Sequence, residues 1–147
     1  MFENILVVCM GNICRSPVGE KLLQQYFPEK SVISAGIVAE ESSLVGKMAD
    51  PQMIQIAKQY NLDISDHRSQ QLTESLCHQA DLILVMDKQQ MELVHQLSPC
   101  SIGKVMLFGH WLGAKTEIPD PYRKNLDTFK SVYETLEQAA SHWKKKL

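Results

Sequence analysis

One short stretch near the start of the chain carries the residue types that could bind and attack a tetrahedral oxyanion. It reads Cys9, Met10, Gly11, Asn12, Ile13, Cys14, Arg15, Ser16 and Pro17. The backbone N–H groups of such a loop can converge on an anion, and a helix beginning at its end adds about half a positive charge. Gly11 and Asn12 tolerate the positive φ that a tight loop demands. The guanidinium of Arg15 can hold two phosphoryl oxygens at once. We therefore predict that this loop, including the backbone of residues 10–14, binds phosphate.

Cys9 is the candidate nucleophile of this loop. A free thiol has a pKa of about 8.5, and a helix N-terminus, an arginine and a hydroxyl donor each favour the thiolate. An ionised Cys9 could attack phosphorus and form a cysteinyl-phosphate intermediate. The hydroxyl of Ser16 is placed to donate to the sulfur, also when the sulfur later becomes the leaving group. The alternative is that Cys9 is a small core residue at the end of a strand.

The pattern around this loop predicts the elements that position it. Short apolar runs at 5–8, 32–35, 82–85 and 105–108 predict buried strands. Helical spacing or caps predict helices at 18–27, 51–60, 73–79, 89–97 and 126–143, with Pro17 opening the first. This alternation indicates an α/β fold, a parallel sheet with helices on both faces. Ligands of such sheets bind outside the carboxyl ends of the strands, which is where the Cys9 loop follows the first strand.

The composition of the chain limits which partners it is expected to bind and in which cellular compartment it is expected to function. The 147 residues, with a formal charge of −2, predict one globular domain over residues 1–147 and argue against nucleic-acid binding. No signal peptide or membrane-spanning run is present, so we expect a cytoplasmic protein without membrane insertion. Four cysteines in a reducing compartment are reactive or packed, and their spacing does not suit a zinc site. Cys77 and Cys100 are interpreted as inert packing residues.

The loop resembles the signature C-x-x-G-N-x-C-R-S-P of the low-molecular-weight protein tyrosine phosphatases. The resemblance covers nearly the whole chain and includes Ser34-Ala35-Gly36, Ala49-Asp50-Pro51, His67, Asp81-Leu82-Ile83-Leu84 and Asp120-Pro121-Tyr122. It implies a four-stranded parallel sheet, no metal and no cofactor. The stretches GKVMLFGHW and EIPDPYRK resemble the bacterial branch associated with capsule and exopolysaccharide. The implied substrate is a phosphotyrosine protein, namely the tyrosine cluster of a membrane-bound autokinase that controls polysaccharide export.

The resemblance also implies roles for residues outside the loop. Asp120, held between Pro119 and Pro121, would protonate the leaving tyrosine oxygen and then activate water; the alternative is a plain Asp-Pro turn. Tyr122 would form one wall of the substrate pocket, although Arg123 stands where animal members carry a second tyrosine.

Two further positions follow from the same resemblance. The opposite pocket wall is expected from residues 37–48, where Leu44 is the best apolar candidate and 40–43 is an extension. His67 would brace the phosphate loop through Asn12, while Gln70 stands where the family often has arginine.

Three alternatives remain open beside a phosphatase. An arsenate reductase needs a shuttling cysteine at the end of the third strand, where the chain reads Leu84-Val85-Met86-Asp87. A non-catalytic phosphotyrosine-binding module would lack the nucleophile or the acid, and both are present. Cys14 could form a protective disulfide with Cys9, a redox role that is compatible with phosphatase activity.

Overall fold

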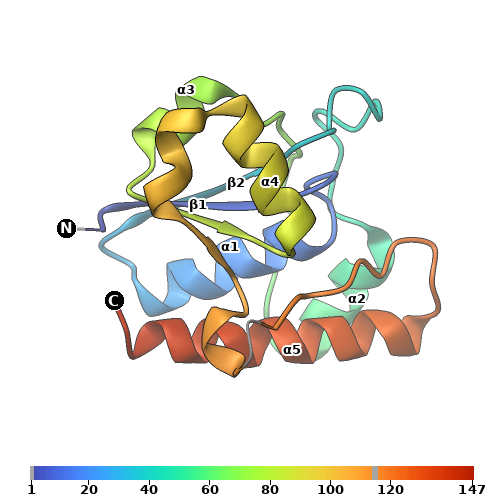
Figure 1. The fold of residues 1–147 in the computed structure, drawn as a ribbon. Helices are drawn as coiled ribbons and strands as arrows, with labels where there is room; N and C mark the ends of the chain where they lie inside the picture. Colours follow the sequence, from blue (N-terminus) through green and yellow to red (C-terminus); the bar gives the residue numbers. More distant parts are fainter. Residues whose placement is uncertain (1, 114–115) are drawn as a thin grey trace.

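The computed structural model describes residues 2–113 and 116–147 and contains one parallel sheet of four strands (Figure 1). The strands are β1 (Asn4–Cys9), β2 (Ser31–Gly36), β3 (Leu82–Val85) and β4 (Val105–Leu107). Their order across the sheet is β2-β1-β3-β4, and all neighbouring pairs are parallel. The predicted α/β class and the four predicted strands are confirmed.

Helices cover both faces of the sheet, as Figure 1 shows. The helices α1 (Arg15–Tyr26), α2 (Pro51–Gln59) and α5 (Leu126–Lys144) pack on one face, and α3 (Glu74–Gln79) and α4 (Lys88–Leu97) on the other. Alternate β1 residues feed the two cores, because successive side chains of a strand point to opposite faces. Ile5 and Val7 join the core with α1 and α5, whereas Leu6 and Val8 join the core with α3 and α4.

Local sequence signals set most helix starts. The side chain of Asp50 accepts from Gln52 N at the start of α2, and Thr73 accepts from Leu76 N at the start of α3. The first helix, predicted over 18–27, begins three residues earlier, because α1 already starts at Arg15. Two short 3₁₀ helices, Pro99–Lys104 and His110–Leu112, were not predicted.

Cys77 and Cys100 were both predicted to be buried packing residues, and the structure agrees for Cys77 alone. Cys77 is a fully buried residue of α3 and belongs to the core on that face of the sheet. Cys100 is exposed, so its assignment to packing is wrong. It lies in the unpredicted 3₁₀ helix Pro99–Lys104, which buries Ser101 instead.

The strand order places a ligand crevice beyond one edge of the sheet. The chain moves from β1 to β2 on one side and reaches β3 and β4 on the other, so the loops after β1 and β3 diverge. Such a switch point leaves a crevice at the carboxyl ends of the strands. The Cys9 loop follows β1 at that point, and Asp87 follows β3.

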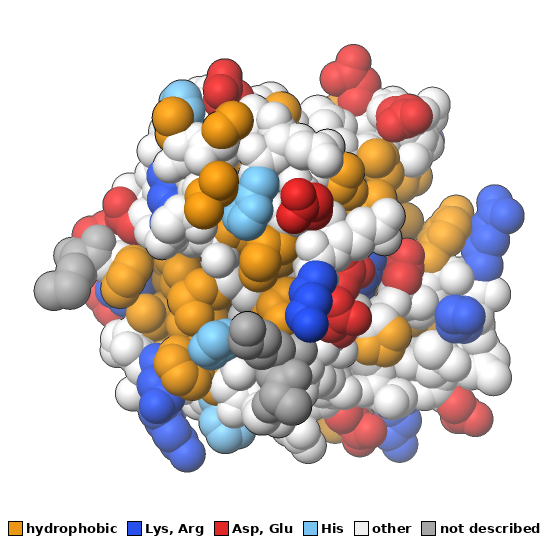
Figure 2. Space-filling view, viewed as in Figure 1, with side chains coloured by type: hydrophobic (Ala, Val, Ile, Leu, Met, Phe, Trp, Pro, Cys, Tyr) orange, Lys and Arg blue, Asp and Glu red, His pale blue; other side chains and the backbone are white. Residues whose placement is uncertain are grey.

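The charged side chains on the surface are of both signs, in agreement with the formal charge of −2. On the face shown in Figure 2, Lys and Arg side chains are interspersed with Asp and Glu. Among residues 2–113 and 116–147, no helix is both long and apolar enough to cross a bilayer.

Candidate active site

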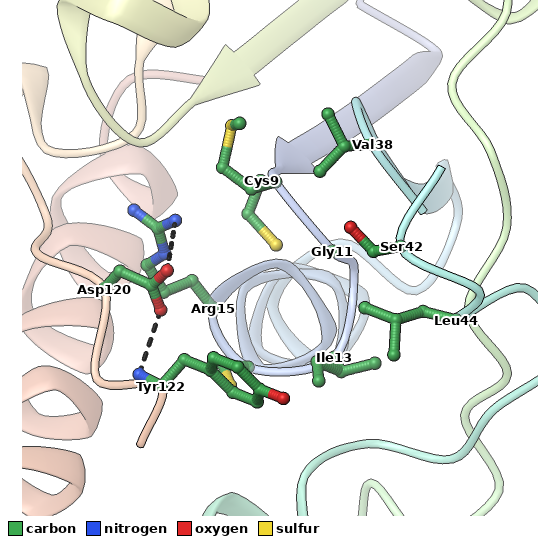
Figure 3. A pocket seen from close by; sticks show the side chains of 11 residues that line it. Cys9, Gly11, Ile13, Arg15, Val38, Ser42, Leu44, Asp120 and Tyr122 are labelled. Atoms are coloured by element: carbon green, nitrogen blue, oxygen red, sulfur yellow. Dashed lines mark hydrogen bonds and ion pairs between the residues drawn. The ribbon is translucent and has the colours of Figure 1, made fainter. Parts of the chain in front are cut away.

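The loop between β1 and α1 forms the floor of a cavity of about 160 Å³ (Figure 3). The loop supplies Met10, Gly11, Ile13 and Cys14, with Cys9 before it and Arg15 after it. The remaining lining residues, Val38, Ser42, Leu44, Asp120 and Tyr122, come from two loops distant in sequence. The structure therefore brings together residues that the sequence offered as separate candidates.

A chain of hydrogen bonds orients the Ser16 hydroxyl toward Cys9. Cys9 Sγ lies 3.0 Å from Ser16 Oγ, in a buried contact. Asn12 Nδ2 donates to Ser16 Oγ at 2.7 Å and to Ser34 Oγ at 2.9 Å. Because the Ser16 oxygen already accepts from Asn12, its own proton is left to donate to the sulfur. This geometry suits a thiolate at position 9.

Asn12 is the residue that holds the loop in shape. Its backbone has φ 60, in the left-handed region, and its side chain is fully buried. Its side-chain oxygen accepts from Gln70 N at 2.9 Å, and its backbone oxygen contacts His67 Nε2 at 2.7 Å. A carbonyl only accepts, so Nε2 of His67 carries the hydrogen. Burial lowers the pKa of His67 and so favours the neutral ring with its hydrogen on Nε2, whereas the bond to Asn12 O opposes that shift.

Two glycines fit the loop to its surroundings by their size. The predicted positive φ at Gly11 is wrong, because Gly11 is not in the left-handed region. A Cβ at this position would lie 2.7 Å from Leu44 Cδ1. Gly36, which belongs to the stretch Ser34-Ala35-Gly36 but had no role predicted for it, ends β2 opposite Cys9. A Cβ on Gly36 would lie 2.7 Å from Met10 O and 2.8 Å from Gly11 C. The Cys9 loop thus rests directly on a glycine of the neighbouring strand.

Arg15 is buried and contacts residues of two different segments, the turn after β3 and the loop that carries Asp120. Its Nη1 donates to Ile118 O at 2.9 Å and lies 3.8 Å from Asp87 Oδ2. Its Nη2 lies 3.7 Å from Asp120 Oδ2. Its Nε is buried and has no hydrogen-bond partner among the described residues. Nε and Nη2 therefore retain donor capacity for an oxyanion, and no side chain caps α1, which frees its first N–H groups as well.

Asp87 was missed by the sequence argument, although a signal was present. It lies two residues after the end of the predicted third strand, at the same edge of the sheet as the Cys9 loop. Its Oδ1 caps α4 by accepting from Gln90 N, and its Oδ2 faces Arg15.

Asp120 and Tyr122 stand at the mouth of the cavity. The Asp120 side chain is about half exposed, and its Oδ1 accepts from Tyr122 N at 3.0 Å. Figure 3 shows the ring of Tyr122 on one side of Ile13 and Leu44 on the other. Ser42, within the 40–43 extension, also lines the cavity. The mouth is therefore apolar on its walls and acidic at Asp120.

A sequence model described as low molecular weight phosphotyrosine protein phosphatase matches residues 4–147. The chain belongs to this family. It is 52% identical over 143 residues to the low molecular weight protein-tyrosine-phosphatase Wzb of Escherichia coli K12, covering 97% of this chain and 94% of that protein.

Solved structures of the phosphatase family share the fold. Wzb of Vibrio vulnificus in complex with benzylphosphonate has a TM-score of 0.97 and 53% identity, with 100% of both chains covered. A more distant neighbour is a cysteine-to-serine mutant of the YwlE arginine phosphatase with a phosphorylated active-site serine. Its TM-score is 0.87 at 28% identity, covering 98% of this chain and 95% of that one.

Cys14 lies in the phosphatase signature but differs from Cys9 in its surroundings. It is buried at the start of α1 and lines the same cavity. Burial, followed by the neighbouring Cys9, raises the pKa of the Cys14 thiol far above its usual range. Both cysteines are free thiols. A protonated Cys14 is a poor nucleophile, which leaves Cys9 as the candidate.

Proposed function

We propose that this chain hydrolyses phosphotyrosine in proteins through a cysteinyl-phosphate intermediate, and that residues 1–147 act as one phosphatase domain. The observation that carries the proposal is a single cavity lined by a thiol, a buried guanidinium and a carboxylate: Cys9, Arg15 and Asp120. These groups match the needs of the reaction, namely a nucleophile, a clamp for phosphoryl oxygens and a proton donor.

In the first step, the Cys9 thiolate attacks phosphorus and forms the S–P bond while the bond from phosphorus to the tyrosine oxygen breaks. The proton of Asp120 passes to that oxygen, because a phenolate with a conjugate pKa of about 10 leaves poorly without it. Arg15 Nε and Nη2, with the loop N–H groups, would bind the equatorial oxygens where charge concentrates.

In the second step, water attacks the phosphocysteine and the S–P bond breaks, releasing inorganic phosphate. The Asp120 carboxylate accepts a proton from the attacking water. The Ser16 hydroxyl, 3.0 Å from the sulfur, donates to Cys9 as it leaves as a thiolate. The site then returns to its starting protonation state.

The walls of the cavity favour an aromatic phosphate over phosphoarginine. Ile13, Leu44 and Tyr122 offer apolar contacts to a phenol ring, and an aromatic wall can stack on it. Benzylphosphonate, the ligand named for the Vibrio vulnificus relative, joins an aromatic ring to a phosphonate. A guanidinium group would instead require acidic partners, and Asp120 is the one acidic residue among those lining this cavity.

The proposed physiological substrate is the tyrosine cluster of a membrane-bound autokinase that controls capsule or exopolysaccharide export. The proposal rests on the resemblance of two stretches to the polysaccharide-associated branch and on the likeness to Wzb. A cytoplasmic location belongs to the same proposal, and the four free thiols agree with a reducing compartment.

Arsenate reduction fits the site less well. That chemistry requires a second cysteine that can exchange with the first. Cys14 is the one other cysteine among the residues lining the cavity, and Met86 and Asp87 follow β3 where a shuttling cysteine would stand.

The test is to mix the protein with a phosphotyrosine peptide, quench in acid, and measure the intact mass. We expect phosphate on Cys9, and we expect Cys9→Ser to lose turnover while still binding inorganic phosphate. Turnover retained in Cys9→Ser would refute the mechanism. Faster hydrolysis of a phosphoarginine peptide than of the phosphotyrosine peptide would instead refute the substrate assignment.

A further inference from the structure

The loop that carries Asp120 is anchored through the backbone of Ile118. Ile118 N donates to Met86 O at 2.8 Å, and Ile118 O accepts from Arg15 Nη1 at 2.9 Å. Ile118 is fully buried, so both bonds are shielded from water. One residue thus connects the end of β3, the phosphate loop and the segment leading to the acid.

A second anchor lies one residue earlier, at Glu117. Its Oε2 accepts from Lys88 N at 2.9 Å. Lys88 is the first residue of α4, and its N–H has no partner within the helix. A carboxylate at a helix N-terminus is also favoured by the helix dipole. Glu117 therefore fastens the Asp120 loop to the same helix start that Asp87 caps.

The chain between these anchors and the acid has few soft torsions. Pro119 has a fixed φ, and Pro121 restricts Asp120 to extended backbone. The Asp120 side chain is further fixed by the bond from Tyr122 N (Figure 3). A rotation of the loop about the backbone bonds of Ile118 would therefore move the Asp120 carboxylate almost as a rigid body.

We propose that Glu117 is a positioning residue for the general acid, setting the direction of the Asp120 carboxylate through its bond to the start of α4. Glu117 is not among the residues that line the cavity, so it acts through the loop rather than on the substrate. This inference rests on the proposed role of Asp120 as the acid. It concerns the step that needs a proton, and not phosphate binding.

The experiment compares kcat/KM for two aryl phosphates in Glu117→Ala, Glu117→Gln and the wild type. Phenyl phosphate has a poor leaving group that needs Asp120, whereas p-nitrophenyl phosphate has an activated one that needs it little. General acid catalysis contributes about 10²–10⁴-fold, so partial misplacement in Glu117→Ala should lower kcat/KM for phenyl phosphate about fivefold. The value for p-nitrophenyl phosphate should change less than about twofold.

The glutamine variant separates positioning from charge. Its amide oxygen can still accept from Lys88 N, so Glu117→Gln should restore most of the phenyl phosphate activity. Glu92→Ala, an exposed change on α4, is the matched control and should leave both substrates unaffected.

Equal losses for both substrates in Glu117→Ala, no loss for either, or a glutamine variant as impaired as the alanine variant would overturn the proposal. A wild type inactive on both aryl phosphates would instead contradict the proposed function itself.

Discussion

Ser16 Oγ lies 3.0 Å from Cys9 Sγ while accepting a hydrogen bond from Asn12 Nδ2 at 2.7 Å. The hydroxyl is thereby turned so that its proton faces the sulfur. A bond from a hydroxyl to a charged group contributes about 1.5–3 kcal/mol. In the proposed mechanism, this contact would stabilise the thiolate both before attack and when the sulfur leaves phosphorus.

Ser16→Ala should therefore lower kcat about tenfold or more, because the departing Cys9 loses its donor. Phosphoenzyme should accumulate, which rapid quench and intact-mass measurement would detect. Ser42→Ala, which changes a hydroxyl residue of the cavity wall, serves as the control. An unchanged kcat in Ser16→Ala would mean that the contact has no role in breaking the S–P bond.

Asp120→Asn tests the general acid. An amide cannot supply the proton, so kcat/KM for phenyl phosphate should fall about 10²-fold or more, and much less for p-nitrophenyl phosphate. Both substrates should also show a lower kcat, since Asp120 is proposed to activate water in the second step. Steady-state kinetics with the two phosphates measures each effect, and a kcat/KM loss independent of the leaving group would remove Asp120 as the acid.

Cys14 is predicted to protect Cys9 from irreversible oxidation. Hydrogen peroxide would oxidise the Cys9 thiolate to a sulfenic acid. The Cys14 thiol, which burial keeps protonated and slow to react, would then give up its proton as its sulfur displaces water from the sulfenic acid and forms a disulfide. After equal peroxide exposure, dithiothreitol should restore the activity of the wild type but only a fraction of that of Cys14→Ser. The idea is abandoned if both recover equally.

His67 makes stability depend on pH in a defined direction. Burial lowers its pKa from the ordinary value of 6.5, so the unfolded chain binds a proton more readily than the folded one. The contribution of His67 to stability is therefore full above pH 6.5 and is lost as pH falls toward its folded pKa. Urea unfolding at about pH 7.5 and about pH 5.5 should show this loss in the wild type.

The loss should be smaller in His67→Gln, whose amide can still donate to Asn12 O. His78→Gln, a change at an exposed side chain, should behave as the wild type. A pH dependence identical in His67→Gln and the wild type would contradict the assignment to His67.

Gly36 should not tolerate a side chain. In Gly36→Ala the Cβ would meet backbone atoms of Met10, Gly11 and Asn12 at 2.7–2.9 Å, so the phosphate loop must shift. We expect a stability loss of about 1–3 kcal/mol and weaker phosphate binding, measured by urea unfolding and calorimetry. Gly103→Ala places its Cβ in open space and is the control. Phosphate affinity as in the wild type would show that the loop accommodates the change.

The amino-acid sequence by itself determined the local features of this protein. Short apolar runs alternate along the chain with capped helical segments, and this pattern predicts an α/β fold. It can be recognised in the sequence because each signal acts within a few residues. The same holds for the Cys9 loop, where the proposed nucleophile Cys9, its hydroxyl donor Ser16 and Arg15 lie within eight consecutive residues. Two local expectations failed, the backbone of Gly11 and the burial of Cys100, since both depended on neighbours distant in sequence.

The tertiary structure decided what surrounds that loop. Ile118 contacts Arg15 across 103 residues, and Gly36 meets Met10 only because β1 and β2 pair in parallel. Asp87 reaches the same arginine because β3 lies beside β1. These relationships depend on strand order and register, which follow from the packing of the whole sheet. A local sequence pattern does not determine which distant residues come into contact. The contacts of Ile118, Gly36 and Asp87 with the Cys9 loop and Arg15 could therefore be identified only from the tertiary structure.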